Sequence, residues 1–420
     1  MRDQVRFFFN RIGERLWVRP LVICVLSILA AFVARIMDRL GFLDIVPDIN
    51  VDSMETLLTV IAGGMLGVAV FAVGSMLSAY ASASSTATPR SFPLVIADDV
   101  SQNALSVFIG AFIYSIVAVV ALKNGYYGTA GRFVLFLVTA FVFAVVVLSF
   151  IRWIDRIARL GRLGHTIDRV EEVTAAALRR RREAPTLGAK QAEGQADGTP
   201  IYADRVGYVQ RIDVPMLQTL AEGSNLAVTV VSLPGAFSTP DKPLAYVSRE
   251  EPAAGDAIDV AAISRAFVIG KDRIFDEDPR FGLVVLSEIA SRALSPATND
   301  PGTAIDIIGA LVRLFILWVE GDEGAEEPSV TFDRVAAPEI SLDDMFDDAF
   351  NAMSRDGAGI IEVDIRLQKA FNTLASIGGV DVQEAARSHA RLAFRYAERA
   401  LQLPEEIERL RAVYRFEEAR

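Results

Sequence analysis

The stretch TLLTVIAGGMLGVAVFAVGSMLSAYASASSTAT, residues 56–88, contains no charged side chain, and 20 of its 33 residues are Gly, Ala, Ser or Thr. It is longer than the roughly 20 residues that an α-helix needs to cross a bilayer. Lipid gives apolar helices no hydrophobic reason to associate, so small residues mark the places where helix backbones approach each other. The stretch therefore predicts a membrane-spanning helix with one specialised face.

Two stripes of small residues share this predicted helix. The first predicts close packing against another helix and consists of Gly63, Gly67 and Gly74. The second predicts a polar, pore-lining face and consists of Ser75, Ser78, Ser82 and Ser85. Hydroxyl groups can line water without the cost of placing a charge in the membrane. The helix therefore either packs against neighbours or lines a polar path.

Three further segments have the length and apolar composition of spans: residues 20–37, 105–122 and 133–151. Arginines are frequent before the first segment and after the fourth, whereas the first loop is acidic. Its acidic residues are Asp44, Asp48, Asp52 and Glu55. Because basic flanks stay in the cytoplasm, the pattern predicts four spans with both termini cytoplasmic, in a bacterial inner membrane. The acidic loop would then form the outer mouth of any path.

Charge and composition exclude several classes of function. Residues 1–200 carry 20 basic and 16 acidic side chains, and residues 201–420 carry 22 and 37, so the second half is strongly acidic. An acidic domain repels nucleic acid. One cysteine and two histidines argue against disulfides, zinc sites and histidine-based catalysis, and no nucleotide-binding fingerprint occurs. We expect no bound cofactor, no metal and no enzymatic activity.

The fold class that follows is a mainly α membrane protein, with four transmembrane helices and a cytoplasmic domain that combines a small β module with a larger helical part. Residues 1–152 form the transmembrane domain, and residues 153–200 form a basic juxtamembrane helix and a flexible linker rich in Gly and Pro. Residues 201–250 contain runs of β-branched residues and predict the β-rich module. Residues 251–420 show helical periodicity and predict the helical cytoplasmic domain. The basic run after the fourth span is expected to lie against anionic headgroups.

Several strings of sequence, taken in order, resemble one family. After the glycine- and serine-rich span come GYVQRID at 207–213, LPGAF at 233–237, DPRFG at 278–282 and SRALSPATNDP at 291–301. Together they resemble the bacterial predicted-membrane-protein family catalogued as domain of unknown function 2254. The resemblance extends over most of the chain, to about residue 400. It implies an inner-membrane protein with several spans and a cytoplasmic domain, and it implies no particular activity.

The last string has two interpretations. Asn299 and Asp300 offer oxygens that could hold an ion on the cytoplasmic side. Alternatively, Asp300 caps a helix that has Pro301 in its first turn, and capping explains most of these residue types. The acidic clusters at 276–278 and 343–348 likewise suit helix starts, and neither has the spacing of a calcium loop.

Our first hypothesis for function is an oligomeric channel, because four spans are few for a complete path within one chain. The lipid bilayer, further copies of the chain and inorganic ions are then its partners, and the acidic regions favour cations. The second hypothesis is a non-conducting membrane sensor or scaffold, in which the glycine stripe is only a helix contact. A membrane enzyme is the weakest hypothesis, because nucleophile–base and metal-ligand patterns are missing from the sequence.

Overall fold

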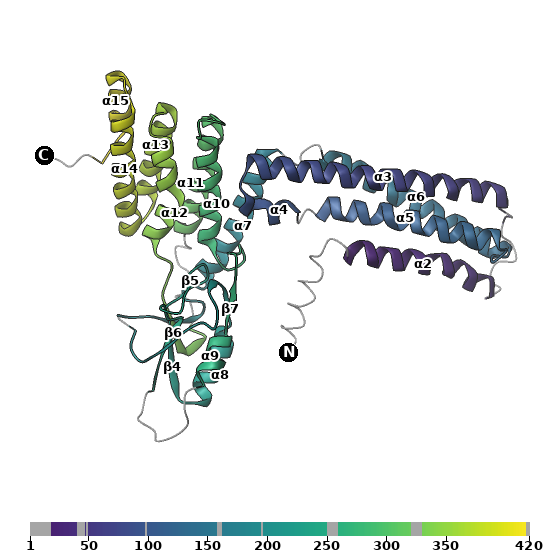
Figure 1. Ribbon diagram of the computed structural model, residues 1–420, viewed down its shortest axis with the longest axis horizontal. Helices are drawn as coiled ribbons and strands as arrows, with labels where there is room; N and C mark the ends of the chain where they lie inside the picture. Colours follow the sequence, from purple (N-terminus) through teal and green to yellow (C-terminus); the bar gives the residue numbers. More distant parts are fainter. Residues whose placement is uncertain are drawn as a thin grey trace. The chain divides into compact units, whose positions relative to one another are not determined.

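The computed structural model describes residues 18–39, 47, 49–96, 99–157, 162–194, 196–249, 259–320 and 330–416. The chain divides into two compact units, Met1–Thr166 and Ile167–Arg420. The first unit is entirely helical where it is described, and the second combines sheets with a row of helices (Figure 1). Each unit has its own core, and each is described here by itself.

The first unit is a bundle of long helices that run side by side (Figure 1). Its helices are α2 (Val18–Arg39), α3 (Val51–Thr86), α4 (Phe92–Ile96), α5 (Asp99–Lys123) and α6 (Thr129–Ile157). Helix α5 is central, because α2, α3 and α6 all pack against it. Small side chains make this close contact possible, and Ala31, Ala34, Ala104 and Ala118 are almost completely buried.

The outer surface of the bundle is apolar, as a surface in contact with lipid requires. Large apolar side chains stay exposed along all the long helices, including Leu26 at 58%, Val70 at 66% and Phe141 at 69%. Monomeric soluble proteins rarely expose contiguous apolar patches of such extent. The bundle is therefore the membrane-embedded part of the protein.

Length and composition alone select a slightly different set of four helices. Among the described residues, α3, α5, α6 and α11 (Pro301–Val319) are long and apolar enough to cross a membrane, while the apolar part of α2, Pro20–Arg35, is shorter. The surroundings distinguish these two helices. Helix α2 belongs to the lipid-facing bundle, whereas α11 buries Ile307, Ile308 and Leu311 completely within the second unit, against α10 and α13. We therefore interpret α11 as a core helix.

Two sheets make up the β part of the second unit. The larger has the strand order β1-β8-β4-β6-β2, in which β8 runs parallel to β1 and β4, and the other pairs are antiparallel. Its strands are β1 (Ala189–Gln191), β2 (Thr199–Ile201), β4 (Leu226–Val230), β6 (Ala245–Arg249) and β8 (Phe332–Ala337). The smaller has the order β5-β3-β7, with β3 (Gly207–Ile212), β5 (Phe237–Ser238) and β7 (Phe267–Gly270). Helices α8 (Val214–Gly223) and α9 (Val260–Arg265) accompany them.

These strands correct the predicted boundaries. The segment 184–200, which we expected to be a flexible linker, contributes β1 and β2 to the larger sheet. The β module also extends beyond residues 201–250, because β7 and β8 come from the region predicted to be helical. Strands of only three residues carry little local signal. They exist here because distant strands supply their hydrogen-bond partners.

The rest of the second unit is a row of helices, seen side by side in Figure 1. They are α7 (Leu163–Glu183), α10 (Pro279–Ala293), α11, α12 (Leu342–Asp356), α13 (Ile361–Ile377), α14 (Val380–Ala400) and α15 (Pro404–Arg411). Phenylalanines fill the space between them: the rings of Phe315 and Phe346 lie 4.5 Å apart, and those of Phe350 and Phe371 lie 5.0 Å apart. Contacts of this kind fix the helices relative to one another.

Candidate functional site

The glycine stripe of α3 faces away from its own bundle. Gly63, Gly67 and Gly74 are all exposed, and a Cβ built on any of them would meet nothing within 4 Å in the part of the chain that is described. The predicted close packing is therefore not made by the residues that the structure describes. Packing of these glycines against another copy of the chain stays a prediction about assembly.

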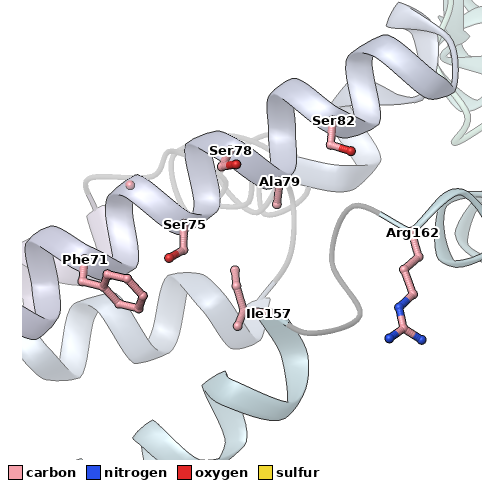
Figure 2. A pocket seen from close by; sticks show the side chains of 8 residues that line it. Phe71, Ser75, Ser78, Ala79, Ser82, Ile157 and Arg162 are labelled. Atoms are coloured by element: carbon pink, nitrogen blue, oxygen red, sulfur yellow. The ribbon is translucent and has the colours of Figure 1, made fainter.

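The serine face of α3 borders a pocket at one end of the bundle. The pocket has a volume of about 560 Å³, and Ser75, Ser78 and Ser82 line it together with residues from the end of α6 and beyond. Figure 2 shows these serines along α3, with Ile157 and Arg162 on the other segments. The fourth predicted residue, Ser85, lies on α3, but its side chain is outside the described residues.

The length of α3 sets the depth of this pocket. The helix has 36 residues, which corresponds to about 54 Å at 1.5 Å per residue, whereas the hydrocarbon core is about 30 Å thick. Counted from Glu55, the last acidic residue before the apolar run, Ser75 lies about 30 Å and Ser82 about 40 Å along the helix. The serines therefore lie at the far edge of the hydrocarbon and beyond it, not in its middle.

Helix α6 gives the same depth independently. Its long uncharged run ends at Arg152, and the next residue, Trp153, packs edge-on against Phe71 of α3, with the ring centroids 6.0 Å apart. Phe71 lies one turn before Ser75, so the first charge of α6 and the first pocket serine lie at similar levels. Both helices thus place the pocket where headgroups begin.

The interior of the bundle is filled with side chains next to this level. Phe108 and Trp153 are 0% and 1% exposed, and their rings lie 6.2 Å apart. Further along, Tyr114 is buried and its hydroxyl lies 2.9 Å from that of Thr139. Among the described residues, this packing leaves the polar face of α3 on the outside of the bundle. A path lined by that face requires more than one copy of the chain.

The opposite end of the bundle holds the described part of the predicted outer mouth. Glu55 pairs with Lys123 at 2.7 Å, so its carboxylate is neutralised within the chain. Asp52 is exposed in the first turn of α3. The helix is capped by Asn50, whose side-chain oxygen accepts from the backbone N–H of Asp52 at 2.8 Å. Asp44 and Asp48 lie outside the described residues.

Arg35 shows how a charge is accommodated near the end of α2. Its guanidinium donates to the backbone carbonyl of Tyr126 at 2.6 Å and lies 4.7 Å from the centre of the Tyr126 ring. Tyr127 donates from its hydroxyl to the carbonyl of Ala31 at 2.9 Å. These contacts hold the loop between α5 and α6 against α2. Arg35 therefore has a structural role, and its long side chain places the charge at the membrane edge.

Asp300 caps α11, and Asn299 forms the turn before it. The carboxylate of Asp300 accepts from the backbone N–H of Thr303 at 3.1 Å and from its hydroxyl at 2.6 Å. The hydrogen bond from the hydroxyl is the main reason that the pKa of Asp300 lies below its usual value. Asn299 has a φ of 50°, a left-handed conformation that asparagine tolerates well. The helix cap accounts for Asp300 and the left-handed turn accounts for Asn299. Neither arrangement favours the predicted ion site over this structural interpretation.

The arginine run at the end of α7 contacts protein, not the membrane surface that we had expected. Arg180 and Arg181 donate to the carbonyls of Asp276 and Glu277, and Arg182 donates to the carbonyl of Leu317 at 2.6 Å, in the last turn of α11. Burial lowers the pKa of Arg181, which is 4% exposed. Cations at the last turn of a helix satisfy its free carbonyl groups. The run thus serves the folding of the second unit.

Asp278 organises a buried junction that the sequence did not reveal. It is 2% exposed, caps α10 through the backbone N–H of Phe281 at 3.1 Å, and binds Arg273 through two hydrogen bonds of 2.7 and 3.0 Å. Gly235 adopts a φ of 95° beside this carboxylate, where a Cβ would collide with it. The strings LPGAF and DPRFG therefore meet in space. Only their joint presence in the sequence could have suggested it.

Acidic residues of α12 are also used in structural contacts. Arg280 donates to Asp348 at 2.6 Å and to Asp344 at 2.5 Å, while Asp347 lies 2.9 Å from Nε2 of His389. Among the residues that the structure describes, no group of three or more His, Cys, Asp or Glu side chains is arranged to hold a metal ion. The clusters predicted from the sequence are helix starts and ion pairs.

Comparison with known proteins agrees with the resemblance. The family model described as "Predicted membrane protein (DUF2254)" matches residues 13–373. The chain belongs to this family. The match includes the bundle, both sheets and the helices up to α13, so all four strings lie within the region that defines the family. In this structure the strings GYVQRID, LPGAF, DPRFG and SRALSPATNDP hold helix starts, turns and the Asp278 junction.

Individual relatives add only local similarity. The chain is 36% identical over 115 residues to the uncharacterized protein Mb1321c of Mycobacterium bovis, and equally to the uncharacterized protein Rv1290c of Mycobacterium tuberculosis. The aligned part is 27% of this chain and 22% of each relative, so the chain spans about a fifth of the length of these proteins. No solved structure gave a significant match.

Proposed function

We propose that this membrane protein is an oligomeric channel in which α3 of each copy faces a shared axis. The observation that carries the proposal is the exposed glycine face of α3, where a Cβ on Gly63, Gly67 or Gly74 would meet nothing within 4 Å in the described part of a single copy. Glycines in a membrane helix allow another backbone to approach closely, and they contribute little to the affinity of a helix for lipid. A second copy of α3 is a partner that such a face fits.

The depth of the serines shapes the path that we propose. Between Val60 and Gly74 every exposed residue of α3 is non-polar, and the hydroxyl groups of Ser75, Ser78 and Ser82 follow at the inner end. A path along α3 would thus combine a narrow apolar part with a hydroxyl-lined vestibule. Apolar constrictions gate by excluding water, which fits a channel that is closed at rest. We propose Ser85 as a further member of the vestibule.

Charge supports cations as the permeant species. Residues 201–420 carry 22 basic and 37 acidic side chains, and Asp52 is exposed at the start of α3. Acidic vestibules raise the local concentration of cations. In this proposal the protein lies in the bacterial inner membrane with both termini in the cytoplasm, and it has no catalytic role.

Assembly is the first test. Gly67→Leu places a large side chain where a neighbouring backbone would lie, so we expect the particle mass in detergent to fall toward that of one chain. Ala140→Leu is the matched control, because Ala140 is exposed on α6 and ends with the same side chain, a gain of three carbon atoms against four for Gly67→Leu. Light scattering on the purified full-length protein measures both masses. An unchanged oligomer mass for Gly67→Leu would refute packing through this face.

Accessibility and conduction are the second test, made in a Cys24→Ser background. Cysteine at Ser78 should react with a small charged thiol reagent, while cysteine at Phe141, which is 69% exposed toward lipid in the middle of α6, should not, because a thiolate barely forms in hydrocarbon. Liposomes with the reconstituted protein should pass cations, and Ser78→Arg should suppress the flux. If cysteine at Phe141 reacts as fast as cysteine at Ser78, the serine face is not a distinct water-lined surface.

A non-conducting sensor or scaffold is the second candidate, and one observation favours it: the uncovered face of α3 has no polar group between Val60 and Gly74. In that case the glycines hold copies of α3 together without opening a path. The assembly and flux experiments described above also distinguish the scaffold from the channel. A stable oligomer that Gly67→Leu disrupts, with no ion flux at any voltage or membrane tension, supports the scaffold.

A further inference from the structure

We propose that the pocket at the inner end of α3 binds the phosphate headgroup of an anionic phospholipid from the adjoining leaflet. The inference goes beyond the proposed channel, because it requires neither ion conduction nor a second copy of the chain, and it assigns to a lipid phosphate the Ser75 and Ser78 hydroxyls that the channel assigns to a water-lined vestibule. It rests on the make-up of the pocket walls, on hydrogen-bond donors that have no partner, and on the depth of the pocket.

The pocket walls are of two kinds, as a lipid at the edge of the hydrocarbon requires. Phe71, Ala79 and Ile157 form an apolar part, and the three serines with Arg162 form a polar part (Figure 2). No acidic side chain lines the pocket among the described residues. Its volume of about 560 Å³ lies within the range of typical small-molecule sites and has room for a phosphate and a glycerol unit. The lining therefore suits a negatively charged group with an apolar continuation.

Three side chains of the pocket offer hydrogen-bond donors that are not used elsewhere in the described part of the chain. Within the described part of the chain, the hydroxyl groups of Ser75 and Ser78 and the guanidinium of Arg162 make no hydrogen bond or ion pair. Hydroxyls on membrane helices commonly donate to the carbonyl four residues earlier, as Ser106 does to Gln102 at 2.7 Å. The guanidinium group matches phosphate oxygens in geometry and charge, so these groups form a suitable set of donors for phosphate.

Depth selects a lipid as the source of the phosphate. The apolar wall at Phe71 lies at the level of Trp153 and of Arg152, the first charge of α6, and the polar wall continues one to three turns further along α3. A phospholipid presents its groups in the same order, acyl chain first and phosphate next. Arg152, exposed near the end of α6, adds positive charge at this level and raises the local concentration of anionic lipid.

Native mass spectrometry of the purified full-length protein tests the proposal. The protein is mixed with dioleoyl-phosphatidylglycerol or with dioleoyl-phosphatidylcholine at equal concentrations, and the bound copies are counted. We expect at least tenfold stronger retention of the anionic lipid. Arg162→Gln should remove that preference, whereas Arg152→Gln, which changes an exposed arginine outside the pocket, should keep it. The double variant Ser75→Ala, Ser78→Ala keeps the helix and should weaken retention several-fold.

Other outcomes overturn the assignment. Equal retention of the two lipids would show that the phosphate charge is not recognised. If Arg162→Gln and Arg152→Gln reduce the retention of phosphatidylglycerol equally, the lipid is attracted to a basic surface in general and not to this site. Displacement of phosphatidylglycerol by millimolar inorganic phosphate would identify a site for the free anion. Because none of these readouts depends on ion flux, a failure here is distinct from a failure of the proposed channel.

Discussion

Asp364 of α13 allows a sharp test of the packing in the second unit. The residue is 2% exposed, and neither of its oxygens has a hydrogen-bond partner among the residues that the structure describes. The pKa of Asp364 is raised to about 8, mainly because the carboxyl group is buried and secondly because Glu406 carries a negative charge. The carboxyl group is therefore mostly protonated at neutral pH in the folded protein and ionised in the unfolded chain, whose pKa is near 3.8.

The magnitude follows from proton linkage. Between the unfolded and the folded pKa, the folded state binds one more proton than the unfolded state, so the free energy of unfolding falls as the pH rises. The slope is about 1.4 kcal/mol per pH unit. From pH 5 to pH 7 this single group should cost about 3 kcal/mol of stability. Above pH 8 the cost should become constant, and below pH 4 it should vanish.

Asp364→Asn removes the ionisable group while keeping the shape of the side chain. The melting temperature of the variant relative to the parent should therefore rise by roughly 5–10 °C from pH 5 to pH 7, given the few degrees per kcal/mol expected for a unit of this size. Differential scanning fluorimetry on the full-length protein in detergent measures it. Contributions of all other groups cancel in this difference between two pH values.

Two further variants make the result interpretable. Asp272→Asn makes the same chemical change at an exposed carboxylate and is the control for the loss of one negative charge. Glu406→Gln removes the second cause of the shift, so the pH dependence due to Asp364 should become smaller and should end at a lower pH. A parallel pH dependence in the parent and in Asp364→Asn would show that Asp364 is hydrated in the folded protein, and the reasoning would fail.

The remaining predictions concern topology and helix packing. Cysteine labelling from outside the cell should reach positions 50 and 124, which replace Asn50 and Asn124, but not a cysteine that replaces the exposed Asp197; labelling of the latter would contradict the orientation. Gly282→Val should lower the melting temperature by several degrees, because a Cβ at Gly282 would collide with the buried side chain of Thr174. Thr174→Ala in the same chain should recover part of the loss, and no recovery would argue against this contact.

Much of the membrane part could be predicted from the sequence because its signal is local. An uncharged run longer than the bilayer thickness defines α3, α5 and α6 without knowledge of their neighbours. Composition was less decisive for α2 and α11. Helix α11 is long and apolar enough to span, and only its surroundings, which bury Ile307 and Leu311 completely, identify it as a core helix.

The second unit was harder to predict because its signals are non-local. Strands β1 and β2 have three residues each, and they depend on β8 and β6, which lie far away in the sequence. The Gly- and Pro-rich composition of 184–200 therefore indicated a linker. The arginines of α7 gave a similar error, because a run of positive charge looks the same whether it faces headgroups or helix carbonyls such as that of Leu317.

The shared face of the serines could be predicted from the sequence, but its depth could not, and its role in lining a path stays a prediction. Spacing alone placed Ser75, Ser78 and Ser82 on one face, and the structure brings all three to one pocket. Their depth required two further facts, the full length of α3 and the contact between Phe71 and Trp153. Nothing in the sequence indicated that Arg162 lines the pocket, because it is one of many arginines that follow the fourth span.

The family strings and the pocket point to different parts of the molecule, and this difference matters for experiments on function. The strings supply caps and turns, such as Asp278 and Asp300 at helix starts and Gly235 in a left-handed turn. Substitutions there should first unfold the second unit, and a loss of function would then say little about mechanism. Gly63, Gly67, Gly74 and Ser78 of α3 are exposed in the described part of the chain, so substitutions such as Gly67→Leu and Ser78→Arg should leave the fold intact. Functional loss from variants at these positions, with normal melting behaviour, is the evidence that can distinguish a channel from a scaffold.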